Sequence, residues 1–207
     1  MRGNFLWDDD FYVTNNKSLR SNDGIEKIWL EARDPQRYLT DVVPQYYPMT
    51  ITTFWVQTRG HDWQNPLPSW PFHLVNVLLH FASAWMLWTI LRRLNVPGAY
   101  VAAAIWALHP VQVESVAWIT ERKNVLSVFF LFASIIVYLR FAGLDLLRGE
   151  PAKDDPAEPL AGSADQPARA SNGIFVLPSE PGKLYALALI LFVCSILSKS
   201  ITGTMPG

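Results

Sequence analysis

Four stretches of the chain are mostly apolar and contain no Asp, Glu, Lys or Arg. They run between Asp62 and Arg92, Arg93 and Glu114, Lys123 and Arg140, and Lys183 and Lys199. A helix needs about 20 mostly apolar residues to cross the hydrocarbon core of a bilayer. Each stretch is therefore a candidate membrane-spanning helix, and we expect an all-α integral membrane bundle with about four spans in this chain.

We place these four spans at residues 72–91, 99–119, 124–144 and 184–198. The second reaches the required length only if its helix continues through Pro110 and Glu114. Proline is tolerated in membrane helices where neighbouring groups satisfy the freed backbone. The fourth span is followed closely by the end of the chain at Gly207, which gives it the appearance of a truncated element.

Two regions lie outside the spans. Residues 1–71 are polar but rich in Trp and Tyr, and they contain two candidate short helices, at 24–33 and 48–60. Both would suit helices lying at the membrane surface, although an ordinary folded loop explains them equally well. Residues 145–182 contain six Pro with many Ala, Asp and Glu, a composition typical of a disordered linker.

The positions of Lys and Arg predict the orientation. Arg92 and Arg93 follow the first span, and residues 140–183 carry five further basic residues. Because short cytoplasmic connections are enriched in Lys and Arg, we expect both connections in the cytoplasm. The chain then divides into four predicted segments. Residues 1–71 form an extracytoplasmic loop, and residues 72–144 form three spans with an outward turn. Residues 145–182 form a cytoplasmic linker, and residues 183–207 form a truncated fourth span.

Composition excludes several other classes of protein. Only 17% of residues are charged, whereas about a quarter are charged in soluble domains. A net charge of -1 with no clustered basic face argues against a nucleic-acid partner. The single cysteine, Cys194, excludes a disulfide framework and a cysteine-based zinc site.

Three consecutive carboxylates, Asp8, Asp9 and Asp10, form the densest acidic cluster. Adjacent carboxylates raise one another's pKa, and a carboxylate held at a membrane surface can act as a general base toward a hydroxyl. A solvated acidic turn or a loose divalent-cation site would have the same sequence.

Polar residues inside the expected spans form a second set. His73, Asn76 and His80 share one face of the first span, where hydrogen bonding between helices is a commoner role than chemistry. Two histidines without a third ligand are weak evidence for a metal. Glu114 lies among apolar residues, where an uncompensated carboxylate costs on the order of 3 kcal/mol, so it needs a partner or a wet cavity.

Acids and bases also converge at the outward ends of the spans. Glu121, Arg122 and Lys123 occupy the turn before the third span, and Lys199 directly follows the fourth. An interfacial salt-bridge cluster and a snorkelling lysine are the simpler explanations. Together with Asp8, these residues would also suit a site for a phosphate-bearing lipid, in which cations hold the phosphate and a carboxylate activates an acceptor.

Several segments resemble one family. They are NFLWDDDFYVTNN, YYPMTITTFW, FHLVNVLLH, ALHPVQVESVAWITERKNVLS and LSKSITGT. They resemble the membrane part of the protein O-mannosyltransferases that carry tetratricopeptide repeats, and of their bacterial relatives. That family belongs to the GT-C class of multi-span glycosyltransferases, which use polyprenyl-phosphate sugars. The resemblance covers most of residues 4–144 and 184–204.

The resemblance implies a role for each candidate residue. The catalytic carboxylate would be Asp8 or Asp9, with Asp10 a weaker candidate. The donor phosphate would be bound by Arg122, Lys123 and Lys199, with His109, Glu114 and Glu121 in support. The implied reaction is transfer of a hexose, with mannose favoured, to Ser or Thr hydroxyls of a protein acceptor by an inverting displacement.

The resemblance also implies binding partners and a membrane, and other functions stay open beside it. The partners would be a polyprenyl-phosphate sugar, an acceptor protein and the lipid bilayer, with no cofactor, although a divalent metal is not excluded. The membrane would be a bacterial inner membrane, or the endoplasmic reticulum in a eukaryote. Relatives carry a helix before the WDDD segment and further spans and repeats after it, so we expect a fragment that alone is inactive. A transporter or channel segment and a non-catalytic scaffold are the competing functions.

Overall fold

The computed structural model describes residues 5, 8–30, 46–143 and 181–199, and in these residues all regular secondary structure is helical. The elements are η1 (Asp10–Thr14), α1 (Lys17–Arg20), α2 (Gly24–Leu30), α4 (Pro48–Gln57), α5 (Trp70–Arg93), α6 (Ala99–Leu108), α7 (Val111–Ala117), α8 (Arg122–Phe141) and α9 (Pro181–Ser198). The expected all-α architecture is confirmed.

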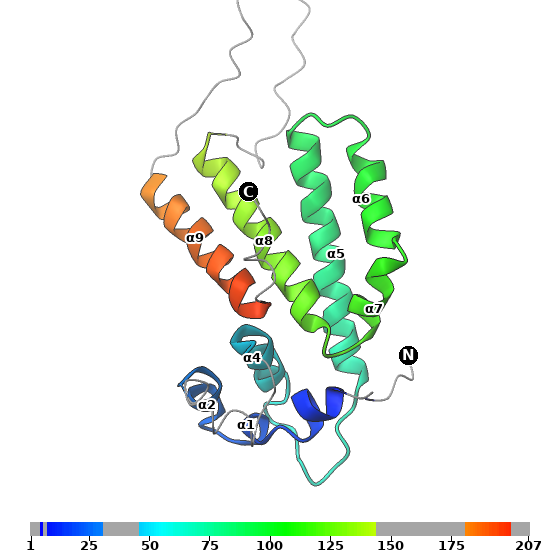
Figure 1. Cartoon of the computed structure of the whole chain (residues 1–207), viewed down its shortest axis with the longest axis vertical. Coiled ribbons are helices and arrows are strands. Elements are labelled where there is room, and N and C mark those ends of the chain that lie inside the picture. The colour runs from blue at the N-terminus through cyan, green and yellow to red at the C-terminus, as the bar shows by residue number, and fades with distance from the viewer. Residues whose placement is uncertain (1–4, 6–7, 31–45, 144–180, 200–207) are drawn as a thin grey trace, which may run out of the picture.

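The long helices run side by side as a bundle (Figure 1), in which α9 packs on α8, α8 on α5, and α5 on α6. Three of them, α5, α8 and α9, are long and apolar enough to cross a membrane. Large apolar side chains such as Phe81 and Ile190 remain exposed on their outer faces, where a bilayer would surround them. The chain is therefore a helical membrane protein, and the expected first, third and fourth spans are confirmed as helices.

Serine residues bring α8 and α9 close together. Ser195 Oγ donates to the Ser127 carbonyl at 2.8 Å, and Ser134 Oγ donates to the Ala188 carbonyl at 2.8 Å. Small residues at such contacts let two helix backbones approach, which is the usual basis of helix packing in membranes. All four residues are buried, so this seam is the tight part of the bundle.

The second expected span is not one continuous helix. α6 ends at Leu108, His109 is extended with ψ at 133°, and α7 begins at Val111. Proline disfavours the helical conformation in the residue before it, which explains why the break falls at His109. The expected continuation of a single helix through Pro110 is therefore wrong, and α6 is a short apolar helix of ten residues.

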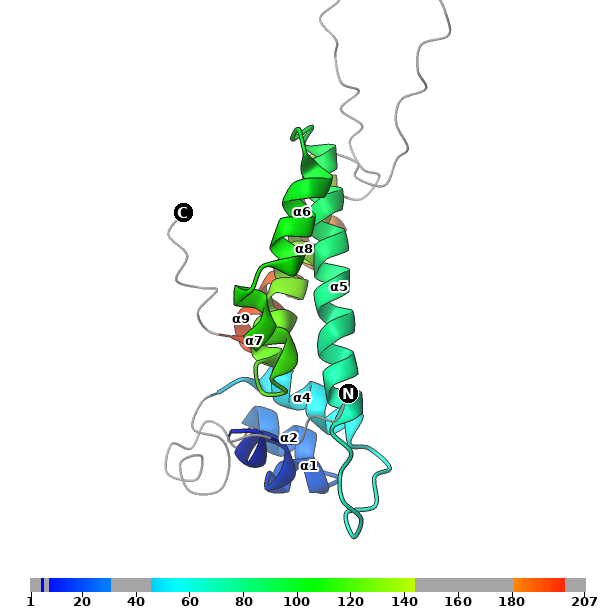
Figure 2. The same ribbon diagram turned by 90° about the vertical axis from the view of Figure 1, so that its right-hand side faces the viewer.

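The short elements η1, α1, α2 and α4, which we call the cap, gather at one end of the bundle (Figures 1 and 2). Both candidate short helices from the sequence are present, as α2 and α4, although residues 31–33 lie outside the described part. The cap shares a hydrophobic core with the adjoining end of the bundle, which includes Val13 and Phe54 of the cap, Phe72 of α5 and Ile119. Within α2, Gly24 is required because the Ser18 carbonyl and the Trp55 ring occupy the space of a side chain.

The expected linker at 145–182 lies outside the described residues except for Pro181 and Gly182, which begin α9. The tail at 200–207 also lies outside them.

Candidate functional site

Asp9 is enclosed between the cap and the bundle. It is 1% exposed, and its Oδ1 accepts hydrogen bonds of 2.9 Å from both the backbone N–H and the hydroxyl of Thr120. Thr120 immediately precedes the turn that carries Glu121, Arg122 and Lys123. Asp9 therefore fixes the acidic segment against that turn, across 111 positions of sequence.

Asp8 and Asp10 are exposed, in contrast to the residue between them. The backbone carbonyl of Asp8 accepts from Phe11 and Tyr12 at the start of η1. Asp10 Oδ1 accepts a local hydrogen bond of 2.8 Å from Thr14. Asp8 and Asp10 are therefore accessible to a ligand, whereas the Asp9 carboxylate is already hydrogen-bonded within the protein.

Arg122, the first residue of α8, is fully buried. Its guanidinium donates to Asn76 Oδ1 at 2.9 Å, to Gln57 Oε1 at 2.7 Å, to the Phe72 carbonyl at 2.9 Å and to Thr53 Oγ1 at 3.4 Å. It also lies over the Phe54 ring, 4.4 Å from the centroid. These acceptors belong to α4 and α5, so Arg122 joins the cap to the bundle.

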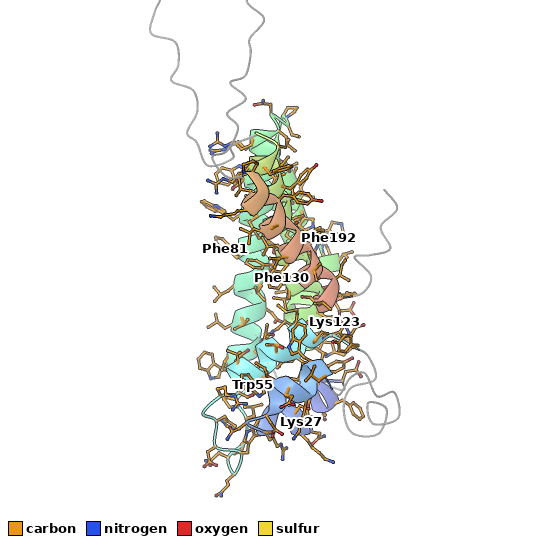
Figure 3. All side chains as sticks on the ribbon, turned by 90° about the vertical axis from the view of Figure 1, so that its left-hand side faces the viewer. Lys27, Trp55, Phe81, Lys123, Phe130 and Phe192 are labelled. Atoms are coloured by element: carbon orange, nitrogen blue, oxygen red, sulfur yellow. The ribbon has the colours of Figure 1, made fainter. Side chains whose placement is uncertain are left out.

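Lys123 and Glu121 form an ion pair where the cap meets the bundle. Lys123 Nζ lies 2.9 Å from Glu121 Oε1, and the two side chains are only 12% and 16% exposed. The ammonium also lies within 6 Å of two ring centroids, 5.8 Å from Tyr12 and 5.7 Å from Tyr47. Figure 3 shows Lys123 at this junction, between the cap residues and the apolar side chains of the bundle.

Asn124 connects this ion pair to the end of α9. Its amide Nδ2 donates to Glu121 Oε2 and, at 3.1 Å, to Ser115 Oγ of α7. Its Oδ1 accepts from Lys199 Nζ, across 75 positions of sequence. One asparagine thus contacts both an acid and a base of the predicted site, although the sequence alone gave no reason to select it.

Tyr12 connects Asp8 to this cluster, because its backbone N–H donates to the Asp8 carbonyl at 3.1 Å while its ring lies 5.8 Å from Lys123 Nζ. Burial raises the pKa of Tyr12, and the surrounding Tyr47, Asp8 and Glu121 raise it further. The tyrosine therefore stays a neutral phenol, so that Lys123 rests against an uncharged aromatic ring.

The remaining predicted residues lie apart from this cluster. His109 is exposed at the break between α6 and α7, where its Nδ1 accepts the Val111 N–H at 3.2 Å. Glu114 is exposed on α7. The structure thus brings together Glu121, Lys123 and Lys199, and it connects Asp8 to them through Tyr12. Asp9 and Arg122 are buried contacts within the protein, and His109 and Glu114 are exposed.

The polar face of the first span is used for helix packing. Asn76 is fully buried, and its Nδ2 donates to the Trp118 carbonyl at 2.9 Å while its Oδ1 accepts from Arg122. His80 Nε2 lies 2.9 Å from the Ala107 carbonyl oxygen, and its ring stacks on Trp106. Hydrogen bonding between helices, the commoner role, is confirmed for both residues. Among the described residues no group of three or more His, Cys, Asp or Glu could hold a metal ion.

Comparison with known proteins gives consistent relatives. The chain is 26% identical over 148 residues to a protein O-mannosyl-transferase of Caenorhabditis elegans and 26% identical over 154 residues to human protein O-mannosyl-transferase TMTC4, in each case over 67% of this chain and 20% of the relative. It is 34% identical over 76 residues to Xenopus laevis protein O-mannosyl-transferase tmtc2, over 36% of this chain and 9% of the relative.

The matches cover about a fifth of the length of the first two of these curated relatives. No family model and no solved structure matches the chain. The chain is thus similar to part of the TMTC protein O-mannosyl-transferases.

Proposed function

We propose that the protein to which this chain belongs is a GT-C type glycosyltransferase that moves a hexose, with mannose favoured, from a polyprenyl-phosphate sugar to Ser or Thr hydroxyls of a protein. The observation that carries the proposal is an exposed carboxylate, Asp8, one turn from Tyr12, whose ring lies 5.8 Å from Lys123 Nζ. Asn124 joins the partner of Lys123, Glu121, to Lys199 at the same end of the bundle. The names of the relatives support the same reaction class.

Asp8 is the proposed general base. Its neighbour Asp9 is already bonded to Thr120, so its Oδ1 is a poor candidate to accept a proton from an acceptor hydroxyl. Asp8 is exposed and is held at the start of η1, which itself is fixed by Asp9. A base must lie within hydrogen-bond reach of the proton it removes, and only an accessible carboxylate meets that condition.

Lys123 and Lys199 are the proposed contacts of the donor phosphate. They belong to two helix ends that Asn124 holds together, and Glu121 is bonded to both Lys123 and Asn124. Cations positioned where negative charge develops stabilise the departing group. The Arg122 guanidinium is surrounded by hydrogen-bond acceptors of the protein. We therefore propose that Arg122 positions this turn and does not contact the phosphate directly.

The chemistry balances as a single displacement. Asp8 takes the proton of the acceptor hydroxyl while its oxygen forms a bond to the anomeric carbon of the donor sugar. The bond between that carbon and the phosphate oxygen breaks, and the polyprenyl phosphate leaves with the electron pair. Attack opposite the leaving group inverts the anomeric centre, and the leaving phosphate needs no general acid because it departs as a stable anion.

The proposal includes an orientation. The cap, as part of residues 1–71, and the turn before α8 would lie on the extracytoplasmic side, which places the proposed site at the outer face. A bacterial inner membrane, or the endoplasmic reticulum membrane in a eukaryote, would supply both the lipid donor and a secreted acceptor.

The test is sugar transfer from labelled polyprenyl-phosphate mannose in membranes that contain the full-length protein. We expect Asp8→Asn to lower transfer by about 10²- to 10⁴-fold, the usual contribution of a general base. Asp10→Asn is the matched control, because it removes an equally exposed carboxylate two positions away, and it should leave transfer within a few-fold of wild type.

Expression and membrane insertion must be matched between the variants. Equal transfer by wild type and Asp8→Asn would remove Asp8 from the mechanism. Absence of transfer in every sample, with the donor shown to be intact, would contradict the enzyme assignment and favour a scaffold or a transporter.

A further inference from the structure

Asn124, near the start of α8, lies at the junction between the cap and the bundle. Its backbone N–H donates to the Glu121 carbonyl at 2.8 Å, and its Nδ2 donates to Glu121 Oε2. Nδ2 also donates to Ser115 Oγ of α7 at 3.1 Å, and Oδ1 accepts from Lys199 Nζ. Both ends of the side-chain amide are therefore used, and separate segments of the chain meet at one side chain.

The close seam between α8 and α9 explains why Asn124 faces Lys199. Ser195 Oγ donates to the Ser127 carbonyl at 2.8 Å, and the two hydroxyl oxygens lie 3.2 Å apart. Asn124 lies three positions before Ser127, and Lys199 lies four positions after Ser195. Each spacing is about one helical turn. Since α8 begins and α9 ends toward the cap (Figure 1), the contact between Asn124 and Lys199 continues the seam by one turn.

A lysine binds an anion better when its side chain is already held in place. The ammonium is carried on a flexible four-carbon stem, and fixing that stem costs conformational entropy. Lys123 is held by the Glu121 carboxylate and lies against two tyrosine rings. Lys199 directly follows the last residue of α9, and Asn124 orients its Nζ. A group that is held before the ligand arrives binds it at a smaller entropic cost.

The chemical type of Asn124 also suits this task. An amide oxygen accepts a hydrogen bond from an ammonium group without carrying a charge. A carboxylate at the same position would compensate the positive charge of Lys199 and repel an anionic ligand. The amide also donates to one oxygen of Glu121, while Lys123 pairs with the other. Asn124 therefore orients a base and an acid and adds no charge to the group.

We propose that Asn124 is a positioning residue that holds the Lys199 ammonium beside the ion pair of Glu121 and Lys123, so that both lysines face one phosphate of the lipid donor. This inference rests on the proposed function for the identity of that ligand. Asn124 acts through Lys199 and does not contact the reacting atoms. Loss of its side chain should therefore weaken binding of the phosphate.

The experiment measures the Kd of polyprenyl phosphate for the purified full-length protein in phosphatidylcholine nanodiscs, by displacement of a fluorescent polyprenyl phosphate. This ligand carries no sugar, so binding is measured without transfer. Asn124→Ala should raise the Kd about three- to tenfold, the effect of one lost hydrogen bond. Asn124→Leu removes the same bonds but keeps the size of the side chain, and it should raise the Kd to a similar extent.

Ser115→Ala is the matched control, because it removes one bond of Asn124 and leaves the contact with Lys199 in place. Its Kd should stay within about twofold of wild type. Thermal unfolding of every variant in the same nanodiscs identifies any change in Kd that follows from loss of structure.

A double-mutant cycle separates a positioning role from a structural one. Lys199→Ala alone should raise the Kd about tenfold. The double variant Asn124→Ala/Lys199→Ala should stay within about twofold of Lys199→Ala, because the asparagine acts through the lysine. Two independent effects would instead multiply.

An unchanged Kd in both Asn124→Ala and Asn124→Leu would overturn the inference. Multiplying effects in the cycle, or an equal loss of affinity in Ser115→Ala, would also overturn it. Sugar transfer is measured with the same variants to keep the two proposals apart. If wild type transfers no sugar but Asn124→Ala binds the lipid phosphate more weakly, the proposed function alone is contradicted. If transfer depends on Asp8 while the Kd of Asn124→Ala is unchanged, this inference alone is contradicted.

Discussion

Residues of the same type have different tasks in this molecule, and burial distinguishes them. Asp9 is enclosed and bonded to Thr120, while Asp8 is open. Arg122 is enclosed by α4 and α5, while Lys123 lies beside it at the edge of the proposed site. Adjacent residues on a helical turn face different directions, so neighbours in sequence meet different surroundings.

Arg122→Lys should destabilise the protein although it keeps the charge. Lysine cannot reproduce the planar fork that donates to Asn76, Gln57 and the Phe72 carbonyl at once. Loss of several hydrogen bonds from a buried charged group should lower the free energy of unfolding by about 2–4 kcal/mol. Thermal unfolding in detergent measures this, with Arg92→Lys as control, because Arg92 is exposed near the end of α5. Equal melting temperatures would refute the role.

Asp9→Ala should also lower stability, by about 1–3 kcal/mol, because it leaves the buried N–H of Thr120 without its acceptor. Asp10→Ala removes an exposed carboxylate with only a local bond to Thr14 and should change stability by less than about 0.5 kcal/mol. The two variants are compared by thermal unfolding in the same detergent. A larger loss in Asp10→Ala would show that Asp9 is not the anchor of this segment.

At the scale of elements, small residues set how closely two spans approach. The seam between α8 and α9 is built from serines whose hydroxyls bond backbone carbonyls of the neighbouring helix. This close contact also positions the end of α9, where Lys199 meets Asn124. Helix packing one turn away from Lys199 therefore helps to set the geometry of the charged site.

Ser195→Leu should separate α8 from α9. Ser195 is fully buried, so a larger side chain must displace one helix, at a cost of about 1–3 kcal/mol. Ala186→Leu adds a leucine on the same helix at an exposed position and should have little effect. Thermal unfolding and the yield of a crosslink between cysteines placed in α8 and α9 report the change; an unaltered crosslink in Ser195→Leu would contradict it.

At the scale of the whole molecule, the proposed site exists only where the cap, the turn before α8 and the end of α9 meet. Lys199 comes from one end of the described chain and Asp8 from the other. Asn124, which the sequence did not distinguish, connects the acid and the base of this group. Any loosening of the bundle should thus weaken donor binding before it affects the base.

Lys199→Ala should raise the KM for the lipid donor by about tenfold, since one charge-assisted hydrogen bond to phosphate is lost. Lys183→Ala is the matched control, because it removes a lysine from the opposite end of the same helix. Initial rates are measured at varied donor concentration in membranes containing the full-length protein. An unchanged KM in Lys199→Ala would exclude this lysine from donor binding.

Local properties of the sequence were sufficient for the first, third and fourth spans and for the two cap helices α2 and α4, because hydropathy and helical spacing act over a few turns. The break at Pro110 also has a local cause, but the sequence alone did not determine whether the helix would continue through the proline. Whether a membrane helix passes through a proline depends on whether neighbouring helices satisfy the freed backbone. Here His109 is extended and α6 stops.

The sequence by itself determined that this chain forms apolar helices with acids and bases concentrated between them, since charge-free runs of that length are stable as helices in a bilayer. Only the tertiary structure decided that Asp9 and Arg122 are enclosed while Asp8 is open, and that Asn124 joins Glu121 to Lys199. The physical reason is that enclosure depends on side chains brought together from positions up to 111 residues apart. No local pattern along the chain records those contacts.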